Sequence, residues 1–208
     1  MFVEVGANDG LTVSNTWGLA ERGWTGLMIE PIAETAQLCR HNHRDHENIR
    51  VLECAVGATD GAFVTMNVAG VLTTANESVL EEYRSLDWAS AFVTGKQVVA
   101  PLRTLDGILE SDGVAEGFDV LVVDVEGYET EVVAGLSLEQ WRPRMVIMEL
   151  VDTHPDLHAT APADARLGQD FLTAGYVICF KDSINTVFVR DDVWAAAHSG
   201  RGGSVSSG

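Results

Sequence analysis

Short apolar runs and amphipathic segments alternate along most of this chain, a pattern typical of strands that alternate with helices. Strand patterns occur at residues 2–6, 26–30, 49–55, 118–124, 145–149, 176–180 and 186–190. Helix patterns occur at residues 14–23, 31–46, 105–110, 128–134 and 162–174. Strands separated by helices lie parallel, whereas the short link at 181–185 favours an antiparallel hairpin. We therefore expect an α/β fold: a single doubly wound, mostly parallel sheet with an antiparallel last strand pair.

Residues 64–100 interrupt this alternation. They contain two strand patterns, at 64–68 and 97–102, on either side of a helical segment that starts near Glu77. An insertion at this point of an open sheet lies near the edge where ligands bind, so it is either a lid or substrate platform or a plain surface excursion. We expect one domain over residues 1–198 and a flexible, glycine- and serine-rich tail at 199–208.

The charge of the chain restricts its partners. The 208 residues are 46% hydrophobic, as in soluble globular proteins, but 13 basic against 31 acidic residues give a net charge of −18. Such a chain repels nucleic acids and anionic membranes. We expect a neutral or cationic small-molecule substrate, or a metal ion that bridges carboxylates to a substrate.

The cysteines and the hydropathy indicate a compartment. The three cysteines are odd in number and widely separated, so they form no disulfide framework, and a reduced cytoplasmic location is the simplest interpretation. No window approaches the ~18 apolar residues of a membrane helix, and no basic stretch precedes an apolar segment at the amino terminus. We therefore predict a cytoplasmic protein with no membrane partner.

Carboxylates stand near the carboxyl ends of four predicted strands, at Glu4, Glu30, Asp124 and Glu149. Ligands of open α/β sheets bind outside these ends. Any one of these residues is ordinary at the edge of a loop. Four of them at one edge of one sheet predict a functional site.

The first of these strands leads into a turn that contains Gly6 and Gly10. Dinucleotide folds use three closely spaced glycines and a helix end that meets a pyrophosphate, whereas here Glu4 occupies the turn region. A carboxylate suits a cation better than a phosphate. Glu30 stands twenty residues after Gly10, where a nucleotide-binding unit places the acidic residue that holds a ribose. S-adenosylmethionine combines an ammonium, a sulfonium and a free ribose diol, and we predict it as the cofactor.

Carboxylates near the fourth and fifth strands provide candidate chemistry. Asp124 and Glu126 share a face if the strand continues that far, and paired carboxylates serve either as a base or as ligands of a hard divalent cation. Asp124, Glu149 and Asp152 are the predicted ligands of such an ion, with Mg²⁺ the expected metal. His154 is the predicted base, although a loop histidine with no role fits the sequence equally well.

A second group of potential metal ligands lies at the end of the helix at 31–46. Cys39, His41, His43 and His46 follow no spacing typical of a tetrahedral site. They are also distant from the predicted strand ends. We interpret them as a solvated helix terminus.

Several motifs occur together in a recognisable order. They are Val-Glu-Val-Gly-Ala-Asn-Asp-Gly at 3–10, Met-Ile-Glu-Pro at 28–31, Leu-Arg-Thr-Leu-Asp at 102–106, Val-Asp-Val-Glu-Gly at 123–127 with Glu129, Glu-Val-Val-Ala-Gly at 131–135, and Ile-Met-Glu at 147–149. This set resembles the FkbM family of S-adenosylmethionine-dependent methyltransferases. The resemblance extends over roughly residues 2–190.

The resemblance implies a Rossmann-like class I methyltransferase fold with strand order 3-2-1-4-5-7-6. It also implies O-methylation of hydroxyl groups on sugars, polyketides or related small molecules, and the chain looks most similar to compact sugar O-methyltransferases of methylmannose-type polysaccharide synthesis. The residues that it assigns to the cofactor are Glu4, Gly6, Asn8, Gly10, Ser14, Glu30, Pro31, Cys54, Ala55 and Asp124. Asp124 and Glu149 would face the reacting centre.

Two other functions stay open at this stage. A nicotinamide-dependent oxidoreductase would also use Glu30 to hold a ribose, but this chain lacks the middle glycine of the dinucleotide-binding turn. A non-enzymatic nucleotide-binding module would keep the fold without the chemistry. The oligomeric state, a homodimer included, does not follow from the sequence.

Overall fold

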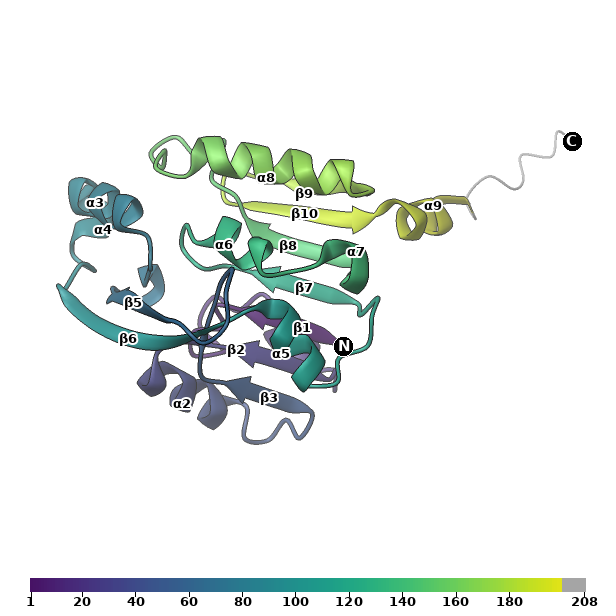
Figure 1. Cartoon of the computed structure of the whole chain (residues 1–208), viewed down its shortest axis with the longest axis horizontal. Helices are drawn as coiled ribbons and strands as arrows, with labels where there is room; N and C mark the ends of the chain where they lie inside the picture. Colours follow the sequence, from purple (N-terminus) through teal and green to yellow (C-terminus); the bar gives the residue numbers. More distant parts are fainter. Residues whose placement is uncertain (200–208) are drawn as a thin grey trace, which may run out of the picture.

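A seven-stranded sheet runs through the molecule in the computed structural model, which describes residues 1–199 (Figure 1). Its strands, in spatial order, are β3 (Ile49–Leu52), β2 (Gly26–Ile29), β1 (Phe2–Val5), β7 (Val120–Val123), β8 (Met145–Glu149), β10 (Asn185–Arg190) and β9 (Tyr176–Lys181). The first five are mutually parallel, and β10 is antiparallel to both of its neighbours. The expected fold class is confirmed, and so is the strand order that the resemblance implied.

Helices cover both faces of this sheet. They are α1 (Trp17–Ala20), α2 (Ala33–Asn42), α5 (Leu105–Ser111), α6 (Glu129–Ala134), α7 (Leu138–Trp141) and α8 (Ala161–Thr173), whereas α9 (Asp191–Ser199) follows β10 and has no buried residue. Val3 and Val5 of β1 pack with apolar side chains of α5 to α8, whereas Phe2 packs on the other face with α1 and α2. Because both faces are covered, β1, β2 and β7 are buried at every position, which explains why all their residues except Glu4 are apolar or glycine.

The segment between β3 and α5 forms a small unit of its own. It contains β4 (Ala55–Val56), β5 (Phe63–Val68), the 3₁₀ turn η1 (Gly70–Leu72), α3 (Glu77–Ser85), α4 (Asp87–Ser90) and β6 (Lys96–Arg103). The strands pair in the order β4-β6-β5. α3 and α4 lie beyond the carboxyl ends of β7 and β8 (Figure 1). They pack on Val151 and Leu157, and the Glu82 carboxylate of α3 accepts the backbone N–H groups of His158 and Ala159. The insertion is therefore anchored to a loop at this edge of the main sheet.

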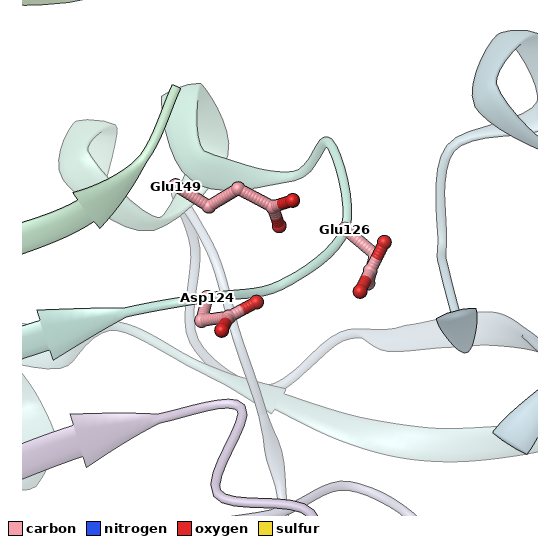
Figure 2. Close-up of side chains that lie close together, drawn as sticks. All are labelled: Asp124, Glu126 and Glu149. Carbon is pink, nitrogen blue, oxygen red and sulfur yellow. The ribbon is translucent and has the colours of Figure 1, made fainter. Parts of the chain in front are cut away.

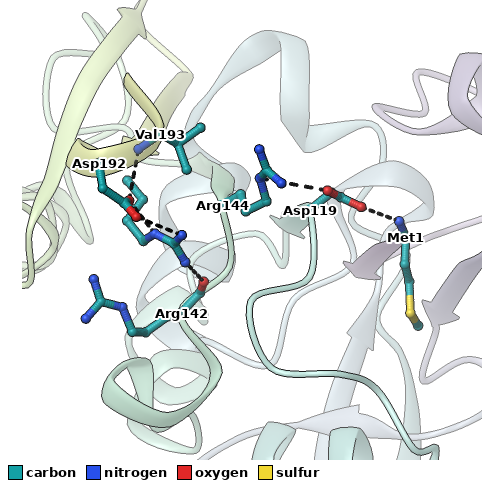
Figure 3. Close-up of polar contacts among 7 residues, drawn as sticks. Met1, Asp119, Arg142, Arg144, Asp192 and Val193 are labelled. Carbon is teal, nitrogen blue, oxygen red and sulfur yellow. Dashed lines mark hydrogen bonds and ion pairs between the residues drawn. The ribbon is translucent and has the colours of Figure 1, made fainter. Parts of the chain in front are cut away.

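Basic side chains gather at the opposite edge of the sheet, where β7 and β8 begin (Figure 3). Arg190 donates to both oxygens of the Asp192 carboxylate and to the carbonyl of Arg142. Arg144 lies 3.9 Å from the Asp119 carboxylate. Several charges at this edge are therefore paired, in contrast to the acidic carboxyl edge described below.

The short elements differ most from the sequence expectation. α1 begins at Trp17 because the Ser14 hydroxyl accepts the N–H groups of Thr16 and Trp17 in a preceding turn. α2 begins at Ala33 instead of Pro31. β4 and α7 have two and four residues and escaped prediction, because periodicity needs a longer segment. α9 was also not predicted, and it ends at Ser199, the first residue of the expected tail; residues 200–208 lie outside the described part.

The helices and the cysteines of the structure concern two expectations from composition. Across residues 1–199, no helix combines the length and the apolar character needed to cross a bilayer. Cys39 and Cys54 are buried free thiols, and Cys179 is an exposed one.

A buried glycine tests the packing of the sheet. A Cβ at Gly26 of β2 would lie 2.2 Å from the Phe2 ring, so we expect Gly26→Ala to lower the free energy of unfolding by about 1–3 kcal/mol. In the control Gly18→Ala, the added Cβ meets only the flexible Arg22 side chain, and helix propensity improves. Urea unfolding of both variants checks this. Equal stability of Gly26→Ala and the unaltered protein would contradict the packing.

Candidate active site

Three adjoining cavities lie at the carboxyl edge of β1, β2 and β7, and Gly6 lines all three. Gly6 follows β1 with φ +85°, and a Cβ there would lie only 1.7 Å from the Asp124 carbonyl oxygen. Asp124 in turn donates its N–H to the Val5 carbonyl, which extends the pairing of β7 with β1. Glycine therefore lets the loops after these two strands meet at the centre of the site.

The first cavity is lined by Asn8, Glu30, Pro31, Thr73, Asp124 and Glu126, among others. The Glu30 carboxylate, 6% exposed, accepts the N–H of Ile32 at 2.8 Å and that of Asn8 at 3.0 Å. Each oxygen of the Glu30 carboxylate therefore accepts one hydrogen bond and can accept another. Burial raises the pKa of Glu30 to about 7, against the opposing effect of the two N–H groups. This arrangement suits a pair of hydroxyl donors.

The second cavity is apolar. The predicted residues Pro31, Cys54 and Ala55 line it, together with Val125 and Tyr128. Burial raises the pKa of the Cys54 thiol to about 11, so this sulfur stays protonated at neutral pH. The cavity offers a slot between apolar walls for a flat ring.

The third cavity is lined by Glu4, Ser14, Asn15 and Asp124, among others. The Glu4 carboxylate is 3% exposed and accepts the Thr16 hydroxyl at 2.6 Å. Burial, together with the charge of Asp124, raises its pKa to about 7 in spite of that hydrogen bond. A cation in this cavity would favour the ionised form of Glu4.

Gly10 has a supporting position. It is not among the residues that line these three cavities, and its carbonyl lies 2.9 Å from His43 Nε2. His43 is 4% exposed and packs against the rings of Trp17 and His46. The expectation of a solvated helix terminus distant from the strand ends is therefore wrong for Cys39 and His43, which are buried against the glycine turn at Gly10.

Asp124, Glu126 and Glu149 form a carboxylate cluster, with one oxygen of each within 4.8 Å of the others (Figure 2). Asp124 follows β7 and Glu149 ends β8, so adjacent parallel strands bring them together. The condition for Asp124 and Glu126 to share a strand face is not met, because β7 ends at Val123. Glu126 instead reaches the cluster from a turn, through a left-handed backbone with φ +55°.

The negative charge of the three carboxylates in this cluster is not balanced by neighbouring groups in the described part of the chain. Burial raises the pKa of each member, and their mutual repulsion adds to this effect at Glu126 and Glu149. Among the described residues, no partner reaches the buried Glu149 Oε2. The three side chains therefore hold protons at neutral pH or bind a cation.

Two predicted residues do not join the cluster. Asp152 forms an ion pair with Lys181 of β9, at 2.7 and 2.8 Å, so its carboxylate is already paired. His154 Nδ1 accepts the N–H groups of Asp156 and Leu157. The proton-accepting nitrogen of a neutral ring is thereby occupied, and the structure supports a role for His154 in the turn instead of as a base.

Two buried residues near the cluster were missed from the sequence. Glu129, 2% exposed, accepts the N–H groups of Val125 and Gly127 and so orders the turn after β7. It belongs to the motifs that carry the family resemblance and to the first turn of a predicted helix, but neither feature assigned it a role. Tyr83 of α3 donates its hydroxyl to Glu126 Oε2. No local pattern connects it with a residue 43 positions away.

Fold and site together define a class I methyltransferase arrangement: the strand order β3-β2-β1-β7-β8-β10-β9, with acidic side chains at its carboxyl edge. The model of the methyltransferase FkbM domain matches residues 4–172. The chain therefore belongs to this family of S-adenosylmethionine-dependent methyltransferases. Among curated protein sequences, none matches the chain.

Solved structures are similar at low sequence identity. An O-methyltransferase from Bacillus cereus in complex with SAH is 13% identical, with a TM-score of 0.49 over 91% of this chain and 73% of that one. Monomeric WbdD is 15% identical, with a TM-score of 0.47 over 91% of this chain. Aeropyrum pernix fibrillarin with bound S-adenosyl-L-methionine is 14% identical, with a TM-score of 0.46 over 90%. The match spans 36% of the WbdD chain and 65% of the fibrillarin chain.

The buried carboxylates predict how stability depends on pH. Glu4 and Glu30 have pKa values of about 7 in the folded state, above their ordinary 4.5. Between pH 4.5 and 7 the folded state therefore binds more protons than the unfolded state. Stability therefore falls as pH rises from about 5 to 7.5, by on the order of 1–3 kcal/mol for each carboxylate. Thermal unfolding in EDTA should show this slope, and Glu4→Gln and Glu30→Gln should each flatten it. A melting temperature that rises with pH in this window would contradict the site's electrostatics.

Proposed function

We propose that this protein is an S-adenosylmethionine-dependent O-methyltransferase that acts on a hydroxyl of a small molecule, a sugar or oligosaccharide, with the help of a divalent cation such as Mg²⁺. We place it in the cytoplasm and in polysaccharide biosynthesis. The observation that carries the proposal is the set of carboxylates around three joined cavities, namely the buried Glu4 and Glu30 and the partly buried Asp124. One cavity suits a cation, one a pair of hydroxyls and one a flat ring, which are the parts of this cofactor.

The residues present fit the cofactor. Glu30 would accept the two ribose hydroxyls, since both of its oxygens keep free lone pairs. Glu4 and Asp124 would face the amino acid portion, where their negative charge balances an ammonium. The apolar slot beside Cys54 and Ala55 would receive the adenine. When bound, the cofactor supplies an electrophilic methyl group on a sulfonium.

The carboxylate cluster fits a hard divalent cation. Asp124, Glu126 and Glu149 offer oxygen ligands within 4.8 Å of one another, so Glu126 takes the place expected for Asp152. The unpartnered Glu149 Oε2 is one such ligand atom. A cation held here would lower the pKa of an acceptor hydroxyl and orient it, which matters because a sugar hydroxyl is a poor nucleophile at neutral pH. A carboxylate of this cluster is then the acceptor of the hydroxyl proton.

Ligand binding tests the cofactor assignment. We expect S-adenosylhomocysteine to bind one-to-one in calorimetry and NAD not to bind. Glu30→Gln removes a charged hydrogen-bond acceptor and should weaken the binding of S-adenosylhomocysteine about 10- to 100-fold. The control Glu34→Gln changes an exposed carboxylate of α2 and should leave the affinity unchanged. Binding of NAD alone would support an oxidoreductase, and binding of neither ligand a non-enzymatic module.

Methyl transfer to a panel of mannose oligosaccharides tests the chemistry. We expect Asp124→Asn to lower kcat at least ~100-fold, because it removes a ligand of the cation next to the reacting hydroxyl. EDTA should have a similar effect on the unaltered protein, and added Mg²⁺ should reverse it. Full activity in excess EDTA would exclude the metal from the mechanism.

A further inference from the structure

Three hydrogen bonds connect the insertion to the turn that carries Glu126. The Thr74 hydroxyl donates to the Glu126 carbonyl at 2.7 Å, and the Asn76 side-chain amide donates to the Gly127 carbonyl at 2.8 Å. The Tyr83 hydroxyl donates to Glu126 Oε2. Both the backbone and the side chain of Glu126 are therefore held by residues of the insertion.

The backbone of this turn requires such support. Glu126 has φ +55°, a left-handed conformation that is unfavourable for a residue with a Cβ. At the adjacent Gly127, with φ +87°, a Cβ would lie 2.5 Å from Val79 Cγ2 of α3. α3 thus packs directly on the turn. The direction in which Glu126 leaves the main chain depends on this contact.

Tyr83 has a feature that packing does not explain. Its ring is 2% exposed and lies in the apolar cluster formed with Val79, Val151 and Leu157. A phenylalanine would fill the same space. Only the hydroxyl distinguishes the two residues, and this hydroxyl donates to a carboxylate of the acidic cluster.

We propose that Tyr83 is a positioning residue whose hydroxyl holds the Glu126 carboxylate toward Asp124 and Glu149, so that the insertion completes the divalent-cation site. This inference rests on the proposed function, because it uses the cation assigned to the cluster. The bond occupies Oε2 and leaves Oε1 available to the cation. Affinity for the cation therefore depends on a side chain that does not itself ligate it.

The test measures Mn²⁺ binding to the full chain, with saturating S-adenosylhomocysteine, by electron paramagnetic resonance of free Mn²⁺. We expect Tyr83→Phe to weaken Mn²⁺ binding about tenfold, the typical effect of losing a hydrogen bond to a charged group, and to leave the affinity for S-adenosylhomocysteine unchanged. The control is Glu82→Gln. It weakens the neighbouring anchor to His158 and Ala159 without touching Glu126, and it should keep Mn²⁺ affinity within twofold.

A double-mutant cycle separates positioning from general support. If Tyr83 acts through the Glu126 side chain, then Tyr83→Phe has no further effect on Mn²⁺ affinity in a Glu126→Ala background, which lacks an acceptor for the hydroxyl. Equal losses in both backgrounds, or an equal loss in Glu82→Gln, would overturn the proposal in favour of a structural role. An unchanged affinity in Tyr83→Phe would also overturn it.

Binding of Mn²⁺ and S-adenosylhomocysteine to the unaltered protein shows whether a negative result contradicts this inference or the proposed function. Failure to bind Mn²⁺ while S-adenosylhomocysteine still binds overturns the role of Tyr83 together with the metal, and it leaves the cofactor assignment in place. Failure to bind S-adenosylhomocysteine contradicts the proposed function itself. Normal binding of both ligands with an unaffected Tyr83→Phe variant contradicts only the positioning role.

Discussion

The burial of like charges at one edge of the sheet is the constraint on which the site depends. Glu4, Glu30, Asp124, Glu126 and Glu149 all stand at the carboxyl edge, and burial raises the pKa of each. Such an arrangement is unfavourable unless hydrogen bonds, protons or cations compensate for it. The protein supplies N–H donors to Glu30 and hydroxyl donors to Glu4 and Glu126. The remaining charge faces the cavities, which favours a cationic ligand there.

The fold places these charges with a few special backbone positions. Gly6 allows the loops after β1 and β7 to meet, and Asn8, with φ +49°, turns its N–H toward Glu30. Glu126 enters the cluster from a second left-handed turn. Strain of this kind persists where surrounding contacts impose it, and it is common at functional sites. Here the contacts come from the insertion and from Glu129, which accepts two N–H groups of the same turn.

Much of this arrangement was predictable because it follows strand periodicity. Buried parallel strands are rich in apolar residues, and a carboxylate at or near the carboxyl end of such a strand lies close to the ligand-binding edge, so Glu4, Glu30, Asp124 and Glu149 were found from the sequence. Contacts between distant segments were not predictable. The pairing of Asp152 with Lys181, the contact of His43 with the Gly10 carbonyl and the bond from Tyr83 to Glu126 depend on tertiary packing. Gly127 indicates a turn at this point, but the left-handed backbone of Glu126 has no signal in a single sequence, since glutamate seldom adopts it.

The central claim is that the acidic edge binds a cationic nucleoside ligand and, beside it, a divalent cation. A crystal structure of the full chain with S-adenosylhomocysteine and Mn²⁺ tests it most directly, because the anomalous signal of manganese locates the ion without assumptions about its ligands. The account predicts ribose hydroxyls on Glu30, an ammonium near Glu4, and a manganese peak among Asp124, Glu126 and Glu149. A nucleoside bound elsewhere, or manganese absent from these three carboxylates, would contradict it.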